Sequence, residues 1–425
     1  MLAPFRALRP AATGAALASR LAPPYDVIDE RERLALVAQD PHNAVRLTLP
    51  RDTDGRPGSR YAAAAAVLSA WEREGALTRD SAAALYVYEE AEPGGHVQRG
   101  LLGALALVED DAGIVLPHEN TMAGPVADRL ALLTATRTDL EPIFLVYDGG
   151  GGAASELVAA PEGFPLVAEA TTGDGTRHRV WAVADPATLA GVAADLLPRR
   201  AVIADGHHRY ATYRLHQAER HAAGDGPGGW DHGLTLLVDA TAFGPQVHAI
   251  HRVLPGLPLA EAVAAAATGM RSARLPDLER AGDADAAVGA TMEALAAAGA
   301  EGTAFVLSDG VAAHLLSSPD ADRLTAALPD DRSPAWRGLD VTTAHRYLVG
   351  VLWGLADEEN TVGFAHSPQE ALAAASTAGG TALLLNPTPV GAVLAVAAAG
   401  ERMPRKSTLF TPKPRSGLVL RPHAA

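Results

Sequence analysis

The chain has 425 residues, of which 48% are hydrophobic and 20% are charged, a composition typical of a globular protein with one large or two medium cores. Because it contains no cysteine, disulfides, thiolate nucleophiles and cysteine-bound metals are excluded. The formal net charge of -15 argues against general nucleic-acid binding, since a basic face supplies most of the sequence-independent affinity for nucleic acids.

Membrane segments are also not expected. Residues 1–23 lack the clear apolar core of a signal peptide, and the longest apolar runs, at residues 347–356 and 390–399, are too short to span a bilayer. We therefore expect a cytoplasmic protein that does not contact membranes.

The first third of the chain mixes strand and helix patterns. Residues 23–28 form a proline-stiffened extended segment, and residues 43–49 alternate in the manner of a strand. Residues 61–74 predict an amphipathic helix, and residues 85–88 and 99–108 predict a hairpin. This order indicates an α+β fold. Neither a P-loop nor a strand-linked Gly-x-Gly-x-x-Gly motif occurs, so the common nucleotide-binding folds find no support.

The loop Leu-Pro-His-Glu-Asn-Thr at residues 116–121 offers candidate catalytic groups. His118 and Glu119 could supply a base or a Mg²⁺ ligand, and Thr121 could add an oxygen donor. A zinc protease is not expected, because the second histidine of its helix is missing. In the alternative interpretation, Glu119 caps the following helix and His118 is a solvated loop residue.

The segment Ala-Val-Ile-Ala-Asp-Gly-His-His-Arg-Tyr at residues 201–210 predicts a strand-to-helix turn. An apolar run ends at Asp205-Gly206, and helix formers follow almost to Gly224. Cationic side chains at a helix start are unfavourable by up to about 1 kcal/mol each. The three residues His207, His208 and Arg209 therefore indicate an anionic partner, most simply a phosphate. Asp205 either caps the helix or acts as a base or metal ligand.

The following part of the chain offers fewer candidates. Residues 232–239 predict a strand, and alternation in the next strand would place His248 and His251 on opposite faces, which disfavours a metal pair. Residues 257–300 are Ala-rich and are expected to form a helical scaffold. Asn386 follows a predicted strand, where a loop often contributes to a ligand site.

The tail contains the only two lysines, Lys406 and Lys413, whereas every other basic residue among the 35 is arginine. A compact ammonium can neutralise a phosphate where a guanidinium does not fit, so both lysines are candidate phosphate ligands. The alternative is a basic terminal arm with two remaining lysines.

These motifs resemble two related groups of proteins. The Asp205–Arg209 turn is similar to that of the free serine kinases of the ParB/sulfiredoxin superfamily, in which a Gly-x-x-Arg-type turn holds a nucleotide phosphate. The wider resemblance runs from about residue 4 to residue 420 and is to a widespread bacterial and archaeal ParB-like family usually labelled a conserved domain of unknown function. Its motifs here are residues 24–28, His118-Glu119-x-Thr121, Asp128-Arg129-Leu130, residues 142–144 and residues 403–408.

The resemblance implies a fold and a set of site residues. We expect an α+β protein of mixed sheets with flanking helices and a ParB/sulfiredoxin-like core, in two lobes with a cleft, at residues 1–255 and 256–425. The expected catalytic residues are Asp205, Glu119 and His118, with Glu119 and Asp205 also as metal ligands; the expected phosphate ligands are Gly206, His207, His208, Arg209, Lys406 and Lys413; and the expected substrate ligands are Thr121, Arg129, His251, Arg252 and Asn386.

The implied activity is phosphoryl transfer to a small hydroxyl compound such as free L-serine, with Mg²⁺ offsetting the charge of the donor. ATP, ADP or pyrophosphate would serve as donor. Two alternatives stay open: a ParB-like nucleotide-binding switch without small-molecule turnover, and a hydrolase of phosphate esters. No nucleic-acid partner is expected.

Overall fold

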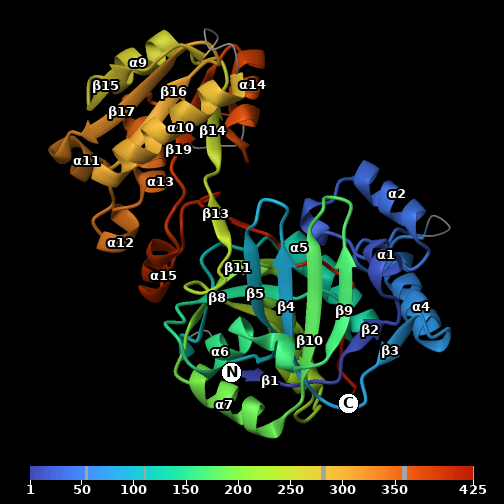
Figure 1. The fold of residues 1–425 in the computed structure, drawn as a ribbon. Helices are drawn as coiled ribbons and strands as arrows, with labels where there is room; N and C mark the ends of the chain where they lie inside the picture. Colours follow the sequence, from blue (N-terminus) through green and yellow to red (C-terminus); the bar gives the residue numbers. More distant parts are fainter. Residues whose placement is uncertain (53–55, 110–111, 279–283, 357–360, 425) are drawn as a thin grey trace. The chain divides into compact units, whose positions relative to one another are not determined.

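The computed structural model describes residues 1–52, 56–109, 112–278, 284–356 and 361–424 (Figure 1). The chain forms two compact units, of which the first comprises residues 1–245 and 412–425 and the second residues 246–411. The sequence prediction assigned the whole tail to the second lobe, whereas the structure packs residues 412–425 in the first unit. The fold is α+β, with mixed and antiparallel sheets and flanking helices.

A nine-stranded mixed sheet organises the first unit. Its order is β6-β11-β8-β12-β5-β4-β10-β9, with β1 added to β5. Strand β11 runs antiparallel to β8, which runs parallel to β12. The pairing of β4 with β5 confirms the predicted hairpin. The strands are β1 Leu2–Ala3, β4 Leu85–Ala91, β5 Val97–Ala106, β6 Val115–Leu116, β8 Ile143–Tyr147, β9 Leu166–Thr171, β10 Arg177–Val183, β11 Ala201–Asp205 and β12 His232–Asp239.

Helices and two short ribbons complete this unit. The helices are α1 Gly14–Ala18, α2 Glu30–Gln39, α3 Val45–Thr48, α4 Ser59–Arg73, α5 Ala123–Thr136, α6 Ala153–Ala159, α7 Pro186–Leu196 and α8 His207–Ala222, with single turns at η1 Tyr25–Val27, η3 Pro161–Gly163 and η4 Gly229–Asp231. The ribbons pair β2 Leu8–Pro10 with β3 Leu77–Arg79, and β7 Thr138–Asp139 with β21 Arg421–Pro422. Through β21, the C-terminus lies in the same unit as the N-terminus (Figure 1).

One predicted strand is wrong, because residues 43–49 contain helix α3. The Asn43 side chain accepts from the N–H of Val45 and donates to the carbonyl oxygens of Ser19 and Leu21. These bonds start a helical turn, and the apolar alternation fits the buried side of that turn as well as it fits a strand. By contrast, α4 confirms the amphipathic helix predicted at residues 61–74.

Helix α8 packs closely on the centre of the sheet. Ile203, Leu145 and Leu237 from neighbouring strands share one buried core with Tyr210 and Tyr213 of α8. A Cβ on Gly233 of β12 would lie 2.3 Å from the ring of Tyr213, so only glycine permits this approach. The core therefore fixes the position of the β11–α8 turn.

The second unit is built on an antiparallel six-stranded sheet of order β15-β17-β16-β19-β14-β18. Helix α10 packs on β16 and α14 packs on β19 (Figure 1). Its strands are β14 His251–Leu254, β15 Met270–Arg274, β16 Ala304–Ser308, β17 Ala313–Pro319, β18 Gly363–Ala365 and β19 Thr381–Leu385, and a ribbon pairs β13 Gln246–His248 with β20 Leu409–Thr411. Its helices are α9 Leu259–Ala266, α10 Ala284–Glu301, α11 Ala321–Ala327, α12 Pro334–Arg337, α13 Asp340–Thr342, a π-helix Thr343–Leu352, α14 Pro368–Thr377 and α15 Val390–Ala398.

The prediction of a helical scaffold at residues 257–300 is wrong at residues 270–274, which form strand β15. Strand β15 lies between α9 and α10, and it pairs with β17 at the edge of the sheet. Alanine-rich composition gave no sign of this strand, because its pairing depends on residues 313–319. Residues 279–283 lie outside the described part of the chain.

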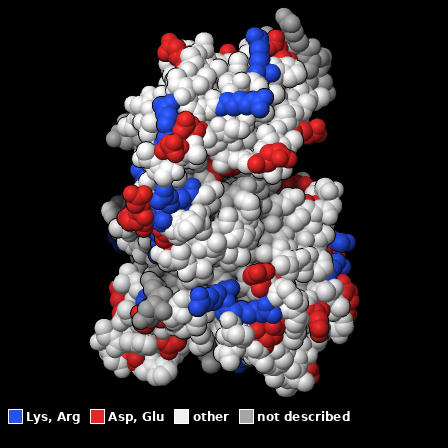
Figure 2. Space-filling view, turned by 90° about the vertical axis from the view of Figure 1, so that its left-hand side faces the viewer, with Lys and Arg blue, Asp and Glu red and all other residues white. Residues whose placement is uncertain are grey.

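On the face shown in Figure 2, Lys and Arg side chains are interspersed with Asp and Glu side chains. Among the helices that the structure describes, none has both the length and the hydropathy needed to cross a bilayer.

Candidate active site

The β11–α8 turn has the predicted form. Strand β11 ends at Asp205 and α8 begins at His207, while Gly206 between them adopts φ 90°, in the left-handed region that favours glycine. Gly206 is the N-cap residue of α8, and no side chain caps this helix start. Asp205 therefore belongs to the strand and does not cap the helix, and the positive end of the helix dipole is left without a capping carboxylate.

Two carboxylates meet one ammonium beside this turn. Lys413 Nζ lies 2.5 Å from Asp205 Oδ1 and 3.3 Å from Asp26 Oδ2. The side chains of Asp205 and Lys413 are 10% and 17% exposed, whereas that of Asp26 is 38% exposed. The cluster is therefore largely buried and opens to solvent on the side of Asp26.

The charges of this cluster stabilise one another. Burial lowers the pKa of Lys413, but the Asp205 and Asp26 carboxylates outweigh burial and hold the pKa above its ordinary value. Burial raises the pKa of Asp26, but Arg209 and Lys413 outweigh it and hold that pKa below its ordinary value. Lys413 is thus a fixed cation at neutral pH rather than a proton acceptor.

Arg209 supports Asp205 from within the first turn of α8. Its Nη2 donates to Asp205 Oδ2 and its Nη1 donates to the carbonyl oxygen of Pro142. Burial lowers the pKa of Arg209, but the carboxylates of Asp205, Glu141 and Asp26 raise it above its ordinary value. Each Nη group makes one of these bonds, so Arg209 orients Asp205 in this structure, and its expected contact with a phosphate stays a prediction.

His207 and His208 accept hydrogen bonds from the loop that precedes α5. His207 Nε2 accepts from the N–H of His118 at 3.3 Å, and His208 Nε2 accepts from the N–H of Met122 at 3.1 Å. Burial lowers the pKa of His208, which agrees with the neutral ring of a nitrogen that accepts. The expected contacts of His207, His208 and Arg209 with a phosphate stay predictions.

The same loop brings Glu119 to His207. His207 Nδ1 lies 3.9 Å from Glu119 Oε2, and the rings of His207 and His118 are edge to face at 4.7 Å. His118 is buried, so it is not a solvated loop residue. Met122 is the N-cap of α5 and makes no side-chain cap bond. The burial of His118 contradicts that part of the alternative interpretation, and the catalytic roles of His118 and Glu119 stay predictions.

Other residues of the first unit lie around the cluster. Arg129 donates to the carbonyl oxygen of Thr48 at 2.6 Å, and its guanidinium stacks 4.2 Å from the ring of Tyr25. Thr121 is exposed. Sequence reasoning did not select Asp26, Tyr25 or Glu141 as site residues. The only signal for them was that they lie in or beside the motifs at residues 24–28 and 142–144.

The other predicted residues belong to the second unit. His251 Nδ1 accepts from the N–H of Leu385 at 3.2 Å, and Arg252 donates to His345 Nε2 and, at 2.9 Å, to the carbonyl oxygen of Lys406. Lys406 itself is exposed and has φ 54°. The structure therefore joins Arg252 with the backbone at Lys406, and it joins Lys413 with Asp205 in the first unit. Asn386 donates to the carbonyl oxygen of Leu295.

The two predicted metal ligands do not fit a magnesium ion as they stand. Both carboxylate oxygens of Asp205 accept from cations, Oδ2 from Arg209 and Oδ1 from Lys413. Across the described residues, no group of three His, Asp or Glu side chains is arranged to hold a metal. Mg²⁺ stays a prediction, and no catalytic step below depends on it.

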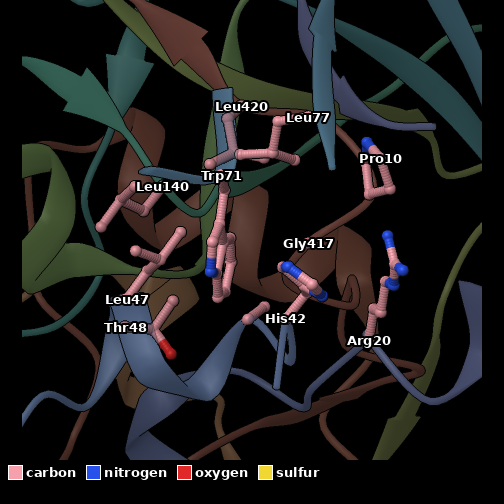
Figure 3. Close-up of a pocket in the computed structure, with 11 residues that line it drawn as sticks. Pro10, Arg20, His42, Leu47, Thr48, Trp71, Leu77, Leu140, Gly417 and Leu420 are labelled. Atoms are coloured by element: carbon pink, nitrogen blue, oxygen red, sulfur yellow. The ribbon is translucent and has the colours of Figure 1, made fainter. Parts of the chain in front are cut away.

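The cavities of the first unit are small where they are enclosed. The pocket in Figure 3 has a volume of about 10 Å³, with Trp71 and Leu77 facing Arg20 and His42, and it contains none of the predicted site residues. A second cavity, of about 40 Å³, lies behind the cluster and is lined in part by Arg129, Glu141 and Arg209. Volumes of about 10 and 40 Å³ suit water rather than a substrate. Two larger open pockets of this unit, of about 630 and 380 Å³, are lined by none of the predicted site residues.

Comparison with known proteins gives one extensive match. A family model described as "Protein of unknown function (DUF1015)" matches residues 2–342. The search of curated proteins gave no match.

Several solved structures resemble the chain weakly. One is a free serine kinase mutant in complex with AMP (13% identity, 72% of this chain and 88% of that chain, TM-score 0.35). Another is C-terminally truncated SbnI from Staphylococcus aureus (12% identity, 75% of this chain and 85% of that chain, TM-score 0.33). A third is a conserved hypothetical protein from Pyrococcus furiosus (12% identity, 72% of this chain and 90% of that chain, TM-score 0.31). Such low scores and identities establish neither a common fold nor a common activity.

Proposed function

The chain belongs to the DUF1015 family, whose description assigns no activity, and we propose that it is a small-molecule phosphotransferase with its active site at Asp205 and Lys413. One observation carries this proposal. A lysine ammonium lies 2.5 Å from a strand-end carboxylate, beside the start of a 16-residue helix that no side chain caps. A helix start and a fixed cation are the groups that bind and neutralise a phosphoryl group.

The proposed reaction transfers a phosphoryl group from donor to acceptor. The acceptor hydroxyl oxygen attacks phosphorus, and the bond from phosphorus to the bridging oxygen of the donor breaks. Lys413 neutralises charge on the non-bridging oxygens, with the first-turn N–H groups of α8 as further donors. The hydroxyl proton passes to Glu119, which is 38% exposed and is oriented by His207.

The roles of the two aspartates follow from their partners. Both oxygens of Asp205 are paired with cations, so Asp205 serves to hold Lys413 in place. Asp26 is more exposed and borders the open side of the cluster. The proposed acceptor is a small hydroxyl compound such as free L-serine, and the proposed donor is ATP, ADP or pyrophosphate.

Product analysis tests the proposal. The purified protein is incubated with one labelled donor at a time: ATP labelled at the γ-phosphate, ADP labelled at the β-phosphate, or labelled pyrophosphate. Each incubation contains one of a panel of hydroxyl amino acids, of which serine is tested first. Labelled phosphoserine, formed in step with donor loss, is the expected result. Release of orthophosphate without an acceptor would instead identify a hydrolase, and binding without turnover would identify a switch protein. A Lys413→Met variant, which lacks the ammonium of the site, serves as the inactive control. Lys406→Met, which loses the other lysine, is its matched control.

A further inference from the structure

A single buried oxygen joins the two chain segments that bring Asp26 and Lys413 to the site. Glu141 Oε1 accepts from the N–H of Tyr25 at 3.0 Å and from Ser416 Oγ at 2.8 Å. Tyr25 immediately precedes Asp26, and Ser416 lies three residues beyond Lys413. We propose that Glu141 is a positioning residue that fixes these segments to each other and thereby holds Lys413 between Asp26 and Asp205.

The surroundings of Glu141 fit this role. Its side chain is 5% exposed, so neither hydrogen bond competes with bulk water. Its other oxygen, Oε2, lies 4.0 Å from Arg129 Nη1, and the charge of Arg209 also acts on the carboxyl group. Glu141 comes just before the buried strand β8, so its backbone is held in place by the sheet.

Other contacts near Lys413 attach its segment to the sheet: Gln98 Nε2 donates to the carbonyl oxygen of Pro412 at 3.2 Å, and the N–H of Arg415 donates to the Tyr88 hydroxyl at 3.4 Å. A backbone bridge joins Ala22 to Ser416, with N–H to O distances of 3.1 and 2.8 Å, but it ends before Tyr25. Pro412 and Pro414 on either side of Lys413 limit the freedom of φ without defining where the segment lies. The bonds to Glu141 add the link between the two segments, because they act on both at one point.

Lysine labelling tests this inference without any substrate. The chain has only two lysines, so a limiting amount of an amine-acylating reagent, followed by mass spectrometry, reports Lys413 against Lys406 within one molecule. Ser416→Ala removes one bond to Glu141 and should speed acylation of Lys413 about two- to tenfold, the range of one hydrogen bond, with Lys406 unchanged. Ser155→Ala is the matched control, because Ser155 is also buried and donates to a carboxylate, that of Asp239.

Variants of Glu141 separate positioning from general stability. Glu141→Gln keeps an acceptor oxygen and should leave Lys413 protected, whereas Glu141→Ala should expose it at least as much as Ser416→Ala does. Equal acylation of Lys413 in wild type, Ser416→Ala and Ser155→Ala would overturn the inference, as would equal rises in Ser416→Ala and Ser155→Ala.

The functional part of the inference rests on the proposed phosphotransferase activity. If transfer is detected, Ser416→Ala should lower the single-turnover rate more than it raises the KM for the donor, and Ser155→Ala should change neither. If wild type transfers no phosphoryl group, the proposed function fails while the labelling result still decides whether Glu141 positions Lys413.

Discussion

Lys413 Nζ and Asp205 Oδ1 are 2.5 Å apart, although the whole of the second unit lies between these residues in the sequence. The contact is made inside the first unit, by a tail that returns to it. We therefore expect variants around this contact to change the rate of phosphoryl transfer, the stability of the first unit, or both.

Replacing Lys413 by arginine should slow phosphoryl transfer although the charge is kept. The ammonium fits between two carboxylates, and a planar guanidinium cannot place its charge at the same point. We expect single-turnover transfer to fall about ten- to a hundredfold, corresponding to one charge-assisted hydrogen bond. Lys406→Arg is the control, and equal rates in both variants would remove the tail from the active site.

Replacing Asp205 by asparagine should lower both activity and stability. The change leaves Arg209 and Lys413 without their shared carboxylate, and breaking a buried ion pair costs about 3 to 5 kcal/mol. Transfer should fall about ten- to a hundredfold, because Lys413 loses the carboxylate that holds it in place. Urea denaturation and single-turnover assays measure the two effects. Asp239→Asn removes a buried carboxylate whose partners are hydroxyls, and it should retain the wild-type transfer rate.

Replacing Arg209 by alanine should destabilise the first unit more than it weakens phosphate binding. Its Nη groups hold Asp205 and the carbonyl oxygen of Pro142, and it is 4% exposed. We expect a loss of about 3 to 5 kcal/mol in the free energy of unfolding. A variant with wild-type stability but no affinity for phosphate in calorimetry would show that Arg209 faces the ligand instead.

Replacing His208 by leucine should loosen the loop that carries Glu119. The change removes the acceptor for the N–H of Met122, and hydrogen exchange at that amide should become up to about tenfold faster. His221→Leu, on the exposed side of the same helix, should leave the Met122 amide unchanged. Slow exchange in His208→Leu would show that another group holds the loop.

Stability should depend on Glu90 between pH 4.5 and about 8. Burial raises the pKa of Glu90 from 4.5 to about 8, and Gln98 Nε2 lies 3.0 Å from it. Because the folded pKa is raised, the stabilising contribution is fully present below pH 4.5 and is lost as pH rises through about 8.

Glu90→Gln should therefore remove this slope and stabilise the protein at pH 8 by a few kcal/mol, since one pKa unit corresponds to about 1.4 kcal/mol. Urea denaturation across this pH range measures the effect. Glu169→Gln, on exposed strand β9, is the control. If Glu90→Gln keeps the wild-type dependence of the free energy of unfolding on pH, other groups cause that dependence.

Local patterns predicted much of the fold. The hairpin of β4 and β5, helix α4, strand β12 and the β11–α8 turn all follow from periodicity and from the glycine at position 206. Residues 43–49 were misread because the bonds of Asn43 to residues 19 and 21 are not a property of the local pattern. Strand β15 was missed for a similar reason, since its partner β17 lies 40 to 49 residues further along the chain, beyond the alanine-rich residues 257–300.

The candidate site was predictable only in part. Asp205, Gly206 and Lys413 stood out by residue type and spacing. Asp26 did not, because its role depends on Lys413, from which it is 387 residues away in the sequence. The partners of His207 and His208 were not predictable for a related reason: they are the backbone N–H groups of residues 118 and 122.

The return of residues 412–425 to the first unit has a consequence during synthesis. Arg421 and His423 both bind the buried carboxylate of Asp139, at 2.8 Å each. The ribosome releases these residues only after it has made the entire second unit. Until then the nascent first unit lacks Lys413 and both side chains that bind the Asp139 carboxylate. A chain whose translation stops before residue 412 thus lacks both the ammonium of the site and the two side chains that bind Asp139, which makes it a ready target for proteolysis rather than a partly active product.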